Sequence, residues 1–465
     1  MKATLATVLL GLLLLSVAAW RDQPPAPPPG VTKLVWVSDD NPLRREQVRL
    51  FNRLNQDLEV SLDPNNGGNE KVIVQSIAGV GPDLFDCFNG ADLDAYYRAG
   101  IALDVTDRLA DHGIDIRQGF WPAILPTSIG PDGRVYGVPT NVGHNGIWFH
   151  KEIFEADGVP FPKTPWSTEE FIEVAKKLTK RDSTGRVVRY GFLIDYWGWR
   201  AFMPAFGASL YSRDRTRCTI DSPESIACLR FVHALMHVHR VSPTPTEEST
   251  MSAQGGWGMG SMTLFGARRG AMALGGRWWL ATYRGRQDLQ LGAAEPPFER
   301  FRAWTSAGRT TMINKNSPNR EKAVRWLLFL AGQEYNQLIN DQADGLAAVK
   351  RYCEGPRFLL NPRFPEEDHN AVWREVSARA VPEATSPFVN QRLANRLIDV
   401  QVDLLRTNQK PIEKALRDAA RQVDAAIAQN LEKDPELRRK YERAQRGEEP
   451  VPVDEQAFEL VRQMP

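Results

Sequence analysis

The side chains with the clearest chemistry follow a β-favouring run at residues 190–194. Asp195, Trp197 and Trp199 come directly after this run, with a tyrosine among them. Indole rings offer flat apolar faces, and a carboxylate accepts hydrogen bonds from hydroxyl groups. Together they suit a polyhydroxylated ring, whose C–H faces stack on aromatics while its hydroxyls need polar partners. We therefore expect a ligand-binding loop at this strand end.

A second group of polar side chains follows predicted strands near the N-terminus. Asp39 and Asp40 come after the run 33–37, and Asn89 follows a strand that ends near Asp86. These runs alternate with helical patterns in the order β-α-β-α-β, which is typical of a parallel sheet with helices on both faces. Ligands bind beyond the carboxyl ends of such strands. Both aspartates and Asn89 are therefore candidate residues of a cleft edge.

The sequence contains no recognisable catalytic or cofactor motif. H-E-x-x-H, G-x-S-x-G and P-loop patterns are absent, and the glycine-rich stretch 251–263 has no strict G-x-G-x-x-G. His233 and His237 have a spacing that could bind Zn²⁺, and the alternative is an exposed helix end without metal. We predict no catalytic residue, no metal and no cofactor, although two carboxylates placed across a glycosidic bond leave no sequence motif.

The four cysteines form neither a redox nor a metal motif, because no Cys-x-x-Cys occurs among them. In an exported chain Cys218 and Cys228 could pair and close a short local loop. The alternative is that Cys87, Cys218, Cys228 and Cys353 are all small buried apolar residues. The sequence leaves both possibilities open.

The stretch 133–178 must position these groups relative to one another. Residues 135–138 and 147–149 are β-favouring runs, and Pro139 and the Asn and Gly residues between the runs favour a break. A capping box at 167–170 then begins a helix. A chain that leaves one sheet and enters another in this way is a crossover between two lobes.

Several motifs carry a resemblance to a known family. The runs Tyr-Gly-Val-Pro (136–139), Trp-Phe-His-Lys-Glu-Ile-Phe (148–154) and Pro-Trp-Ser-Thr-Glu-Glu-Phe (165–171) resemble the crossover of extracellular solute-binding proteins. This is the carbohydrate-binding family that serves ABC importers and includes maltose-binding protein. Residues 265–280 are similar to its helix, basic or small pair, Ala-Met strand and Gly-x-Trp. The resemblance covers roughly residues 31–430 in the family's order.

The resemblance implies an α/β fold of two lobes, each a parallel-rich sheet flanked by helices, joined by hinge crossovers near Pro139, Ala303 and Gly345. The expected parts are a signal peptide or membrane anchor at 1–20, a Pro-rich linker at 21–30, a first lobe of 31–140 with 300–345, a second lobe of 141–299 with 346–430, and a charged C-terminal tail at 431–465.

The resemblance also implies ligand contacts. Trp278 falls on the family's stacking Trp, although Arg277 stands where a Pro is often found, and Asn145 lies in the first crossover. Trp304 lies at the second crossing, where hinge packing is its alternative role. The full set of ligand-binding candidates is Asp39, Asp40, Asn89, Asn145, Asp195, Trp197, Trp199, Trp278 and Trp304.

Composition and the chain ends limit the function further. The 58 basic and 57 acidic side chains nearly cancel, which argues against a nucleic-acid-binding surface. The basic start and apolar run of residues 1–20 fit an export signal or an uncleaved anchor. We therefore expect a periplasmic or otherwise extracytoplasmic protein.

The C-terminal part has a helical pattern at 391–430 with one apolar face, made of Leu393, Leu397, Val400 and Leu404. Residues 432–449 are dense in both charges, which favours a solvated helix or a disordered tail. This tail exceeds the usual family end.

The expected function is that of a monomeric receptor that closes on a carbohydrate and presents it to the membrane permease of an ABC importer, without turning the ligand over. The alternatives are an exported glycan-active enzyme and a membrane-anchored sugar sensor.

Overall fold

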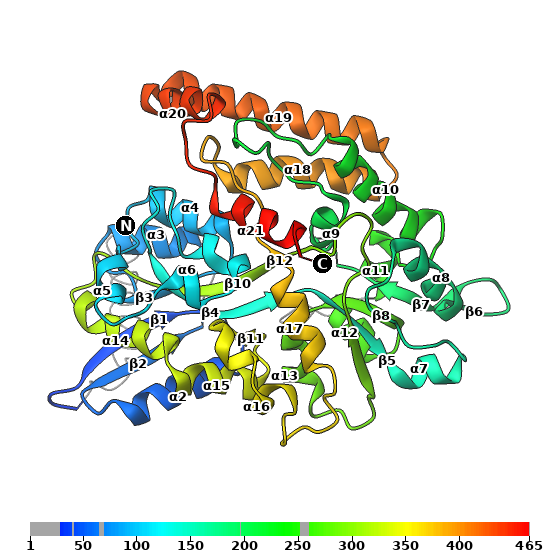
Figure 1. Ribbon diagram of the computed structural model, residues 1–465, viewed down its shortest axis with the longest axis horizontal. Helices are drawn as coiled ribbons and strands as arrows, with labels where there is room; N and C mark the ends of the chain where they lie inside the picture. The colour runs from blue at the N-terminus through cyan, green and yellow to red at the C-terminus, as the bar shows by residue number, and fades with distance from the viewer. Residues whose placement is uncertain (1–27, 40, 65–68, 196, 252–259, 465) are drawn as a thin grey trace, which may run out of the picture.

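The computed structural model describes residues 28–39, 41–64, 69–195, 197–251 and 260–464. Two β-sheets lie side by side with helices around each of them (Figure 1). Among the described residues the first sheet has seven strands, in the order β11-β4-β10-β3-β1-β2 with β12 paired to β10. The second has five, in the order β6-β7-β8-β5-β9. We call the sheets with their covering helices the first lobe and the second lobe.

The first lobe begins with the β-α-β-α-β unit that the sequence predicts. Strand β1 (Thr32–Val37) pairs in parallel with β2 (Leu58–Asp63) and β3 (Leu84–Cys87). The helices between them are α2 (Arg44–Leu54) and α3 (Asn69–Ile77). The other first-lobe helices are α4 (Gly90–Arg98), α5 (Thr106–Ala110), α6 (Ile116–Gly119), η1 (Pro122–Thr127), α14 (Arg320–Ala331) and α15 (Gln333–Gln342). The carboxyl ends of β1 and β3 therefore meet at one sheet edge, as expected.

The second lobe is built on β5 (Gly146–His150), β6 (Lys180–Arg181), β7 (Val187–Leu193), β8 (Gly270–Gly275) and β9 (Leu291–Ala294). Its helices are α7 (Lys151–Ala156), α8 (Thr168–Leu178), α9 (Trp199–Phe206), α10 (Pro223–His237), α11 (Pro245–Met251), α12 (Ser261–Gly266), η2 (Arg277–Trp279) and α13 (Leu280–Tyr283). The predicted capping box begins α8, where the Ser167 hydroxyl accepts from the Glu170 N–H and the Glu170 carboxylate accepts from the Ser167 N–H.

The two sheets are joined by strands that cross between the lobes. Strand β4 (Gly137–His144) runs into β5 through Asn145, and it is antiparallel to β10 (Trp304–Ile313) and β11 (Leu346–Ala347). Gly345 precedes β11 with φ 76°, and a Cβ there would lie 2.3 Å from the Val142 carbonyl oxygen. A side chain at Gly345 would therefore break this pairing.

These crossings correct one expectation, since neither sheet is mostly parallel. In the first sheet β4, β10 and β11 pair antiparallel, and in the second only β7 and β8 pair in parallel among the described strands. At a hinge, one strand carries the chain out of a lobe and a neighbouring strand carries it back. These two strands run in opposite directions, so each sheet contains both parallel and antiparallel pairs.

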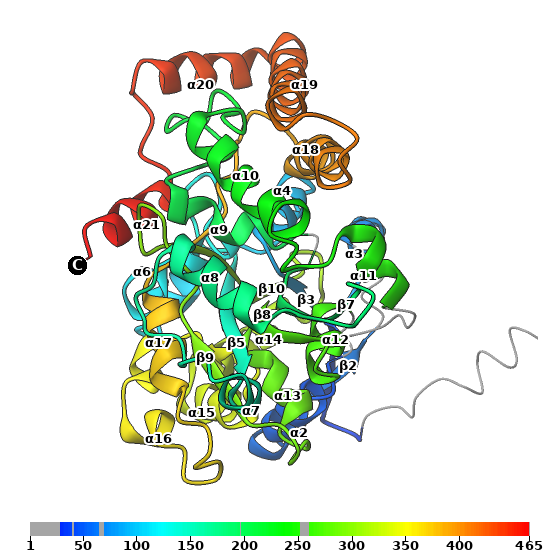
Figure 2. The same cartoon turned by 90° about the vertical axis from the view of Figure 1, so that its right-hand side faces the viewer.

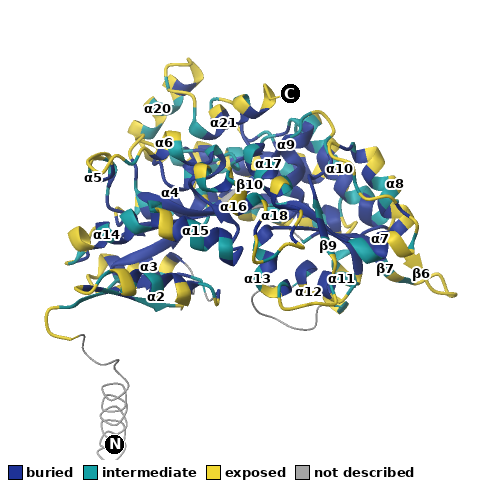
Figure 3. Ribbon diagram, turned by 60° about the horizontal axis from the view of Figure 1, so that its bottom comes forward, coloured by how far each residue is buried: buried dark blue, intermediate teal, exposed yellow. Residues whose placement is uncertain are grey.

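The C-terminal quarter adds η3 (Lys350–Cys353), α16 (Pro356–Leu359), α17 (Asn370–Ala378), β12 (Ala380–Val381), α18 (Gln391–Arg406), α19 (Ile412–Lys433), α20 (Pro435–Gln445) and α21 (Val453–Arg462). Helices α18 and α19 pack together beside α10, and α20 follows them at the top of the molecule (Figure 2). Buried residues are concentrated in the sheets and on the inner helix faces (Figure 3).

Two further expectations for this part of the chain change, and the question that the sequence left open about the cysteines is answered. The buried face of α18 is made of Ala394, Ile398, Val402 and Leu405, whereas Leu393 and Val400 are 45% and 51% exposed. Cys218 and Cys228 are free and buried, as are Cys87 and Cys353, so the local disulfide is not formed. Within the expected charged tail, α21 buries Phe458 and Val461.

The expected export segment at 1–20 lies outside the described residues, as does most of the spacer at 21–30. Within the described part of the chain, no helix combines the length and the apolar character needed to cross a membrane.

A buried charge network fixes the returning strand β10 inside the first lobe. The Arg309 guanidinium is 2% exposed and donates to Thr140 Oγ1 at 2.8 Å and to the Tyr335 hydroxyl at 2.8 Å. Its charge lies 3.5 Å from Asp86 and 3.8 Å from Asp344.

Arg44 on α2 extends the same network. It forms an ion pair with Asp344 and another, at 2.7 Å, with Asp39. Burial by itself would raise the pKa of the Asp344 carboxyl, but Arg44 and Arg309 lower it below its usual value. Asp344 is therefore the charged group that balances two buried arginines.

We predict that Asp344→Ala lowers the free energy of unfolding in urea by about 3–5 kcal/mol, because it leaves Arg44 and Arg309 buried without their shared counter-charge. The matched control is Asp57→Ala, which removes an exposed carboxylate paired with Arg325 at 2.6 Å. This control should leave the urea midpoint close to that of the parent. Equal shifts in the two variants would contradict the role assigned to the network.

Candidate functional site

A cleft of about 420 Å³ lies between the start of α4 in the first lobe and the polar face of α18. The residues that line it are Asn89, Ala91 and Asp92 on one side, and Arg392, Asn395, Arg396, Asp399, Val400 and Asp403 on the other. Among the residues that the structure describes, Asn89 is the one predicted site residue that lines this cleft. The walls therefore come from both lobes and are rich in hydrogen-bonding groups.

The first-lobe wall is positioned by the N-terminus of α4. The Asn89 side chain accepts from the Asp92 N–H at 3.0 Å and so caps the helix. The Asp92 carboxylate accepts from the Phe88 N–H at 3.0 Å and from the Asn69 amide at 2.6 Å. Both side chains are therefore held at the cleft edge by the turn that follows β3.

The second-lobe wall is positioned by the apolar side of α18, which packs into the core of that lobe. The opposite side carries the charged residues, and Arg200 holds Asp399 at 2.7 Å. Arg392 reaches across to the first lobe, where it pairs with Asp92 at 3.2 Å and with Glu70. The α4–α18 contact thus joins the lobes at the edge of the cleft.

The loop after β7 and helix α11 together carry a close pair of carboxyl groups. Asp195 accepts a hydrogen bond from the Ser261 N–H at 2.9 Å. A Cβ on Gly260 would lie 2.8 Å from Asp195 Oδ1 and 3.4 Å from Glu248 Oε1, so the two carboxyl groups face one small volume. This places Glu248, a residue that the sequence did not indicate, beside a predicted site residue.

Burial dominates the electrostatics of this pair. It raises the pKa of Glu248 to about 7, the negative charge of Asp195 adds to the rise, and Arg406 opposes it. Burial also raises the pKa of Asp195, against the hydrogen bonds from Ser261 and the charge of Arg406. Arg406, at the end of α18, therefore links this pair to the helix that lines the cleft.

None of the other predicted site residues that the structure describes lines this cleft. Asp39 is paired with Arg44 at the end of β1, and Asn145 is half-buried between β4 and β5. Trp197 is 37% exposed, and Trp278 is half-buried with its ring centroid 6.1 Å from that of Trp279. Asp40 lies outside the described residues.

Two of the predicted aromatics differ from the expectation. Trp199 is 1% exposed inside the second-lobe core, with the Arg200 guanidinium 4.5 Å from its ring centroid. Trp304 is fully buried and donates its indole N–H to the Val376 carbonyl at 2.7 Å. Neither ring has a face open to a ligand here, so both pack the interior, and for Trp304 this is the hinge-packing alternative.

Arg277, noted in the sequence as a departure at a position often held by Pro, ties the lobes together. Its buried guanidinium donates to Asn370 Oδ1 at 3.0 Å and to the Gly345 carbonyl at 2.9 Å. It also reaches the Asn340 carbonyl at 3.3 Å. Burial lowers its pKa to about 10, with Glu367 opposing that effect. The side chain therefore bridges η2 to the segment before β11.

The residues of α18 are the functional candidates that sequence reasoning missed. Their signal is a polar stripe at helical spacing, visible at positions 392, 395, 396, 399 and 403. Polar and apolar residues interleave along this helix, so its sequence fits more than one choice of buried face. Packing against α10 and α19 selects the face.

The histidines considered for a metal also contact this helix. His233 Nε2 lies 2.9 Å from Asn408 Oδ1, and His237 Nε2 lies 2.7 Å from the Arg406 carbonyl oxygen. Across the described ranges, no group of three or more His, Cys, Asp and Glu side chains is placed to hold a metal ion. The two imidazoles support the end of α18.

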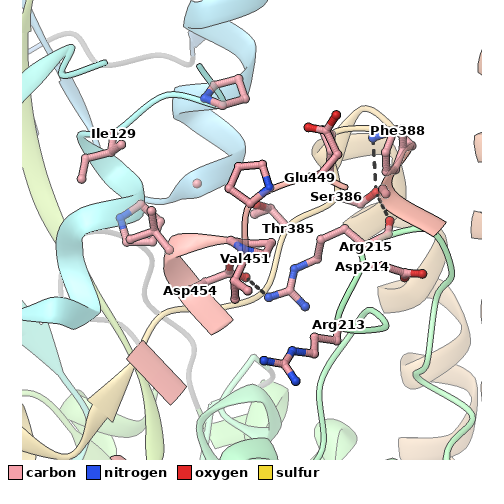
Figure 4. Close-up of a pocket in the computed structure, with 18 of the residues that line it drawn as sticks. Ile129, Arg213, Asp214, Arg215, Thr385, Ser386, Phe388, Glu449, Val451 and Asp454 are labelled. Atoms are coloured by element: carbon pink, nitrogen blue, oxygen red, sulfur yellow. Dashed lines mark hydrogen bonds and ion pairs between the residues drawn. The ribbon is translucent and has the colours of Figure 1, made fainter. Parts of the chain in front are cut away.

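A second and larger cavity, of about 830 Å³, lies on the other side of the α4–α18 contact (Figure 4). Its walls come from α4 and residues 117–133 of the first lobe, residues 212–215 and 385–391, and residues 440–456. None of the nine predicted ligand-binding residues is among the described residues that line it. This cavity is therefore distinct from the cleft.

Comparison with known proteins finds a matching family and a similar protein sequence. Residues 37–337 match the model of a family described as bacterial extracellular solute-binding protein. The chain is 28% identical over 111 residues to an arabinooligosaccharide-binding protein of Halalkalibacterium halodurans. That alignment spans 24% of this chain and 24% of the relative, so the chain matches about a quarter of the relative's length.

Solved structures share the fold over almost their whole length. An ABC substrate-binding protein from Listeria monocytogenes in complex with cycloalternan has a TM-score of 0.73 at 20% identity, over 86% of this chain and 99% of that chain. The maltose/maltodextrin-binding domain from Bdellovibrio bacteriovorus bound to maltotriose has a TM-score of 0.68 at 17% identity, over 86% and 100%. At these identities the likeness shows the fold, and it confirms the two-lobed architecture.

The Glu248 carboxyl makes the stability of the protein depend on pH. Its folded-state pKa of about 7 lies above the usual 4.5, so between these values the folded chain holds a proton that the unfolded chain releases. The stabilising contribution is complete below the usual pKa and is lost as the pH rises through about 7. We predict that Glu248→Gln removes this loss, so that the Tm of the parent falls relative to that of the variant between about pH 5 and pH 8.

The control is the neighbouring Glu247→Gln. Hydrogen bonds from Thr244 outweigh burial and lower the pKa of Glu247, so its titration lies below this pH window. The difference in Tm between this variant and the parent should stay constant from pH 5 to pH 8. A constant difference for Glu248→Gln as well would contradict the assignment.

Proposed function

The chain belongs to the bacterial extracellular solute-binding proteins, and on that premise we propose that it captures a carbohydrate, an oligosaccharide or a sugar-like solute, between its lobes. It then delivers this ligand to the membrane permease of an ABC importer. It acts in the periplasm or another extracytoplasmic space, as a monomer, with the carbohydrate and the permease as its partners. The expected division into lobes at residues 140–141, 299–300 and 345–346 is part of this proposal, although β4 and β11 extend past the first and third of these boundaries as strands of the first sheet.

The observation that carries the proposal is the two-lobed cleft between α4 and α18. Its walls present carboxylates, amides and guanidinium groups, which accept from and donate to the hydroxyls of a sugar. A ligand that contacts Asn89 on one lobe and Arg396 on the other stabilises the arrangement in which the lobes approach each other. Strands β4 and β10 and the segment before β11 are the hinges of that motion.

The site in this proposal combines the cleft residues with the candidates around it. Trp278 and Trp197 supply aromatic faces, Asp39, Asp40, Asp195 and Asn145 supply polar groups, and the charged residues of α18 complete the set. A carbohydrate ligand is supported by the similar proteins, whose names and ligands include arabinooligosaccharide, cycloalternan and maltotriose.

A glycan-active enzyme is the second candidate, because one observation favours it. Asp195 and Glu248 form a close carboxyl pair in which burial raises the pKa of Glu248 to about 7. Glycoside hydrolysis uses two carboxyl groups, one protonated and one ionised. A binding protein is the better account, because the family consists of solute-binding proteins, but the test must include the products.

We predict that the purified chain without residues 1–30 binds an oligosaccharide and leaves it intact. Calorimetry against a panel of sugars measures binding, and chromatography of the recovered ligand measures turnover. Hydrolysed product formed at catalytic rates would overturn the binding-protein reading, and a complete lack of binding across the panel would overturn the carbohydrate ligand. A membrane-anchored sensor would also bind sugar, and a transport assay with the permease separates that role.

We predict that Arg396→Ala and Trp278→Ala each weaken sugar binding about tenfold or more, because hydrogen bonds to a charged group and contacts of an anchoring indole each contribute about 1.5–3 kcal/mol. The matched control is Leu393→Ala, a change on the exposed side of the same helix α18. Calorimetry with the ligand found in the panel measures all three. Unchanged affinity in a folded variant removes that residue from the proposed site.

A further inference from the structure

The C-terminal segment from Arg446 to Arg462, which we call the strap, runs from the end of α20 to the end of α21 across both lobes (Figure 1). The family match ends at residue 337, and the similar solved structures align over nearly their full length with about six-sevenths of this chain. Neither comparison therefore accounts for what the strap does.

One end of the strap is held to the second lobe by a buried ion pair. Arg215 is 2% exposed, and its guanidinium donates to Asp454 Oδ2 at 2.8 Å and to Glu455 Oε2 at 3.3 Å. Both carboxylates are 8% exposed. Figure 4 shows the Arg215 side chain directed at Asp454 on the strap. Because all three charges are removed from water, separating them leaves each one buried without a partner.

The loop that carries Arg215 is itself anchored in the second lobe. The Arg215 carbonyl accepts from the Ser386 hydroxyl at 2.7 Å, and its Nη1 donates to the Ser212 carbonyl at 3.0 Å. Tyr211 and Cys218, at the two ends of this loop, are part of the second-lobe core. The ion pair therefore ties α21 to the body of that lobe.

The other face of α21 is held at the hinge and on the first lobe. Phe458 and Val461 are buried together with Ala303, the residue before β10, and with Val381 of β12. The helix also packs against η1, which lies on β4 and β10 of the first lobe. A movement of one lobe relative to the other must therefore break contacts on one face of α21.

The part of the strap that joins α20 to these anchors covers space rather than filling it. Gly447, Glu449 and the residues from Pro450 to Val453 line the cavity of about 830 Å³, whose opposite wall contains Leu93, Pro126 and Ile129 of the first lobe. A segment held at its ends above an open cavity has little packing of its own to lose when it detaches. The anchors on α21 consequently decide whether the strap stays in place.

We propose that the strap is a latch that holds the two lobes at the separation seen here, and that its release widens the range of lobe separations. Release of the strap also speeds the exchange of ligand in the α4–α18 cleft, and this second effect rests on the proposed function. The lobe separation of the ligand-free protein can be measured without knowing which ligand the cleft binds.

The test uses the full chain with one spin label on each lobe. The labels are attached at Arg53→Cys on α2 and at Ser183→Cys in the β6–β7 turn, two positions that are exposed. The four native cysteines are buried, and burial raises the pKa of each thiol, so the label reacts with the introduced residues. Pulsed electron–electron double resonance then measures the distribution of distances between the two labels in the ligand-free protein.

The variant Asp454→Asn with Glu455→Gln removes both buried counter-charges and keeps the side-chain shapes. Phe458→Ala is a second variant, which weakens the hinge contact without changing charge. The matched control is Glu459→Gln on the same helix, because the Glu459 side chain is 36% exposed and that of its partner Arg213 is 65% exposed. Circular dichroism establishes that each protein is folded.

We expect the parent and Glu459→Gln to share one narrow distribution, and both latch variants to gain a second population of about a tenth of the molecules or more. With the sugar found by calorimetry, stopped-flow dissociation should be about fivefold faster or more in the latch variants than in the control. If both folded latch variants keep the parent's distribution, the latch is overturned. If no sugar binds while the distributions differ, the latch stands and the proposed function fails.

Discussion

The architecture depends on the burial of Arg309 at the point where the chain returns from the second lobe to the first. A guanidinium cannot lose its proton to escape burial at ordinary pH, so its charge must be matched where it lies. Ser38 after β1, Thr140 on β4, Tyr335 on α15 and the carboxylates of Asp86 and Asp344 surround it. Each of these groups comes from a different segment, so the network assembles only when the crossing strands are in register.

The same hinge organises the cleft. With β4 and β10 fixed against the first lobe, the start of α4 and the polar face of α18 approach from opposite lobes. Arg277 adds a second tie, from η2 of the second lobe to the carbonyls of Asn340 and Gly345. The lobes are thus linked by buried arginines at the hinge and by the partly exposed Arg392 pairs at the cleft edge. Buried ion pairs and hydrogen bonds fix the relative positions of the segments that they join, whereas exposed ion pairs separate at little cost in free energy.

The C-terminal strap makes this two-lobed arrangement different from a simple hinge. It contributes a helix that contacts the second lobe through Arg215 and the hinge through Phe458. The strap lines the larger of the two cavities, whose walls mix charged side chains with prolines and aliphatic residues, and it does not reach the residues that line the cleft. Two carboxylates within the expected tail at 431–465, Asp454 and Glu455, are buried and fasten the strap to the second lobe.

The sequence by itself determined the two-lobed class, the β-α-β-α-β start, the capped helix α8 and the crossover at Asn145, because these rest on local periodicity, turn residues and motifs in fixed order. It also placed Asn89 at the cleft, since a polar residue after a parallel strand lies at the carboxyl edge. Only the tertiary structure decided that Trp199 and Trp304 are interior, that α18 turns Arg396 and Asp399 rather than its leucines toward the cleft, and that Glu248 lies beside Asp195. Burial of an aromatic ring or a helix face is set by contacts between segments that are distant in the sequence, such as that of Trp304 with Val376, and local sequence patterns carry no record of those contacts.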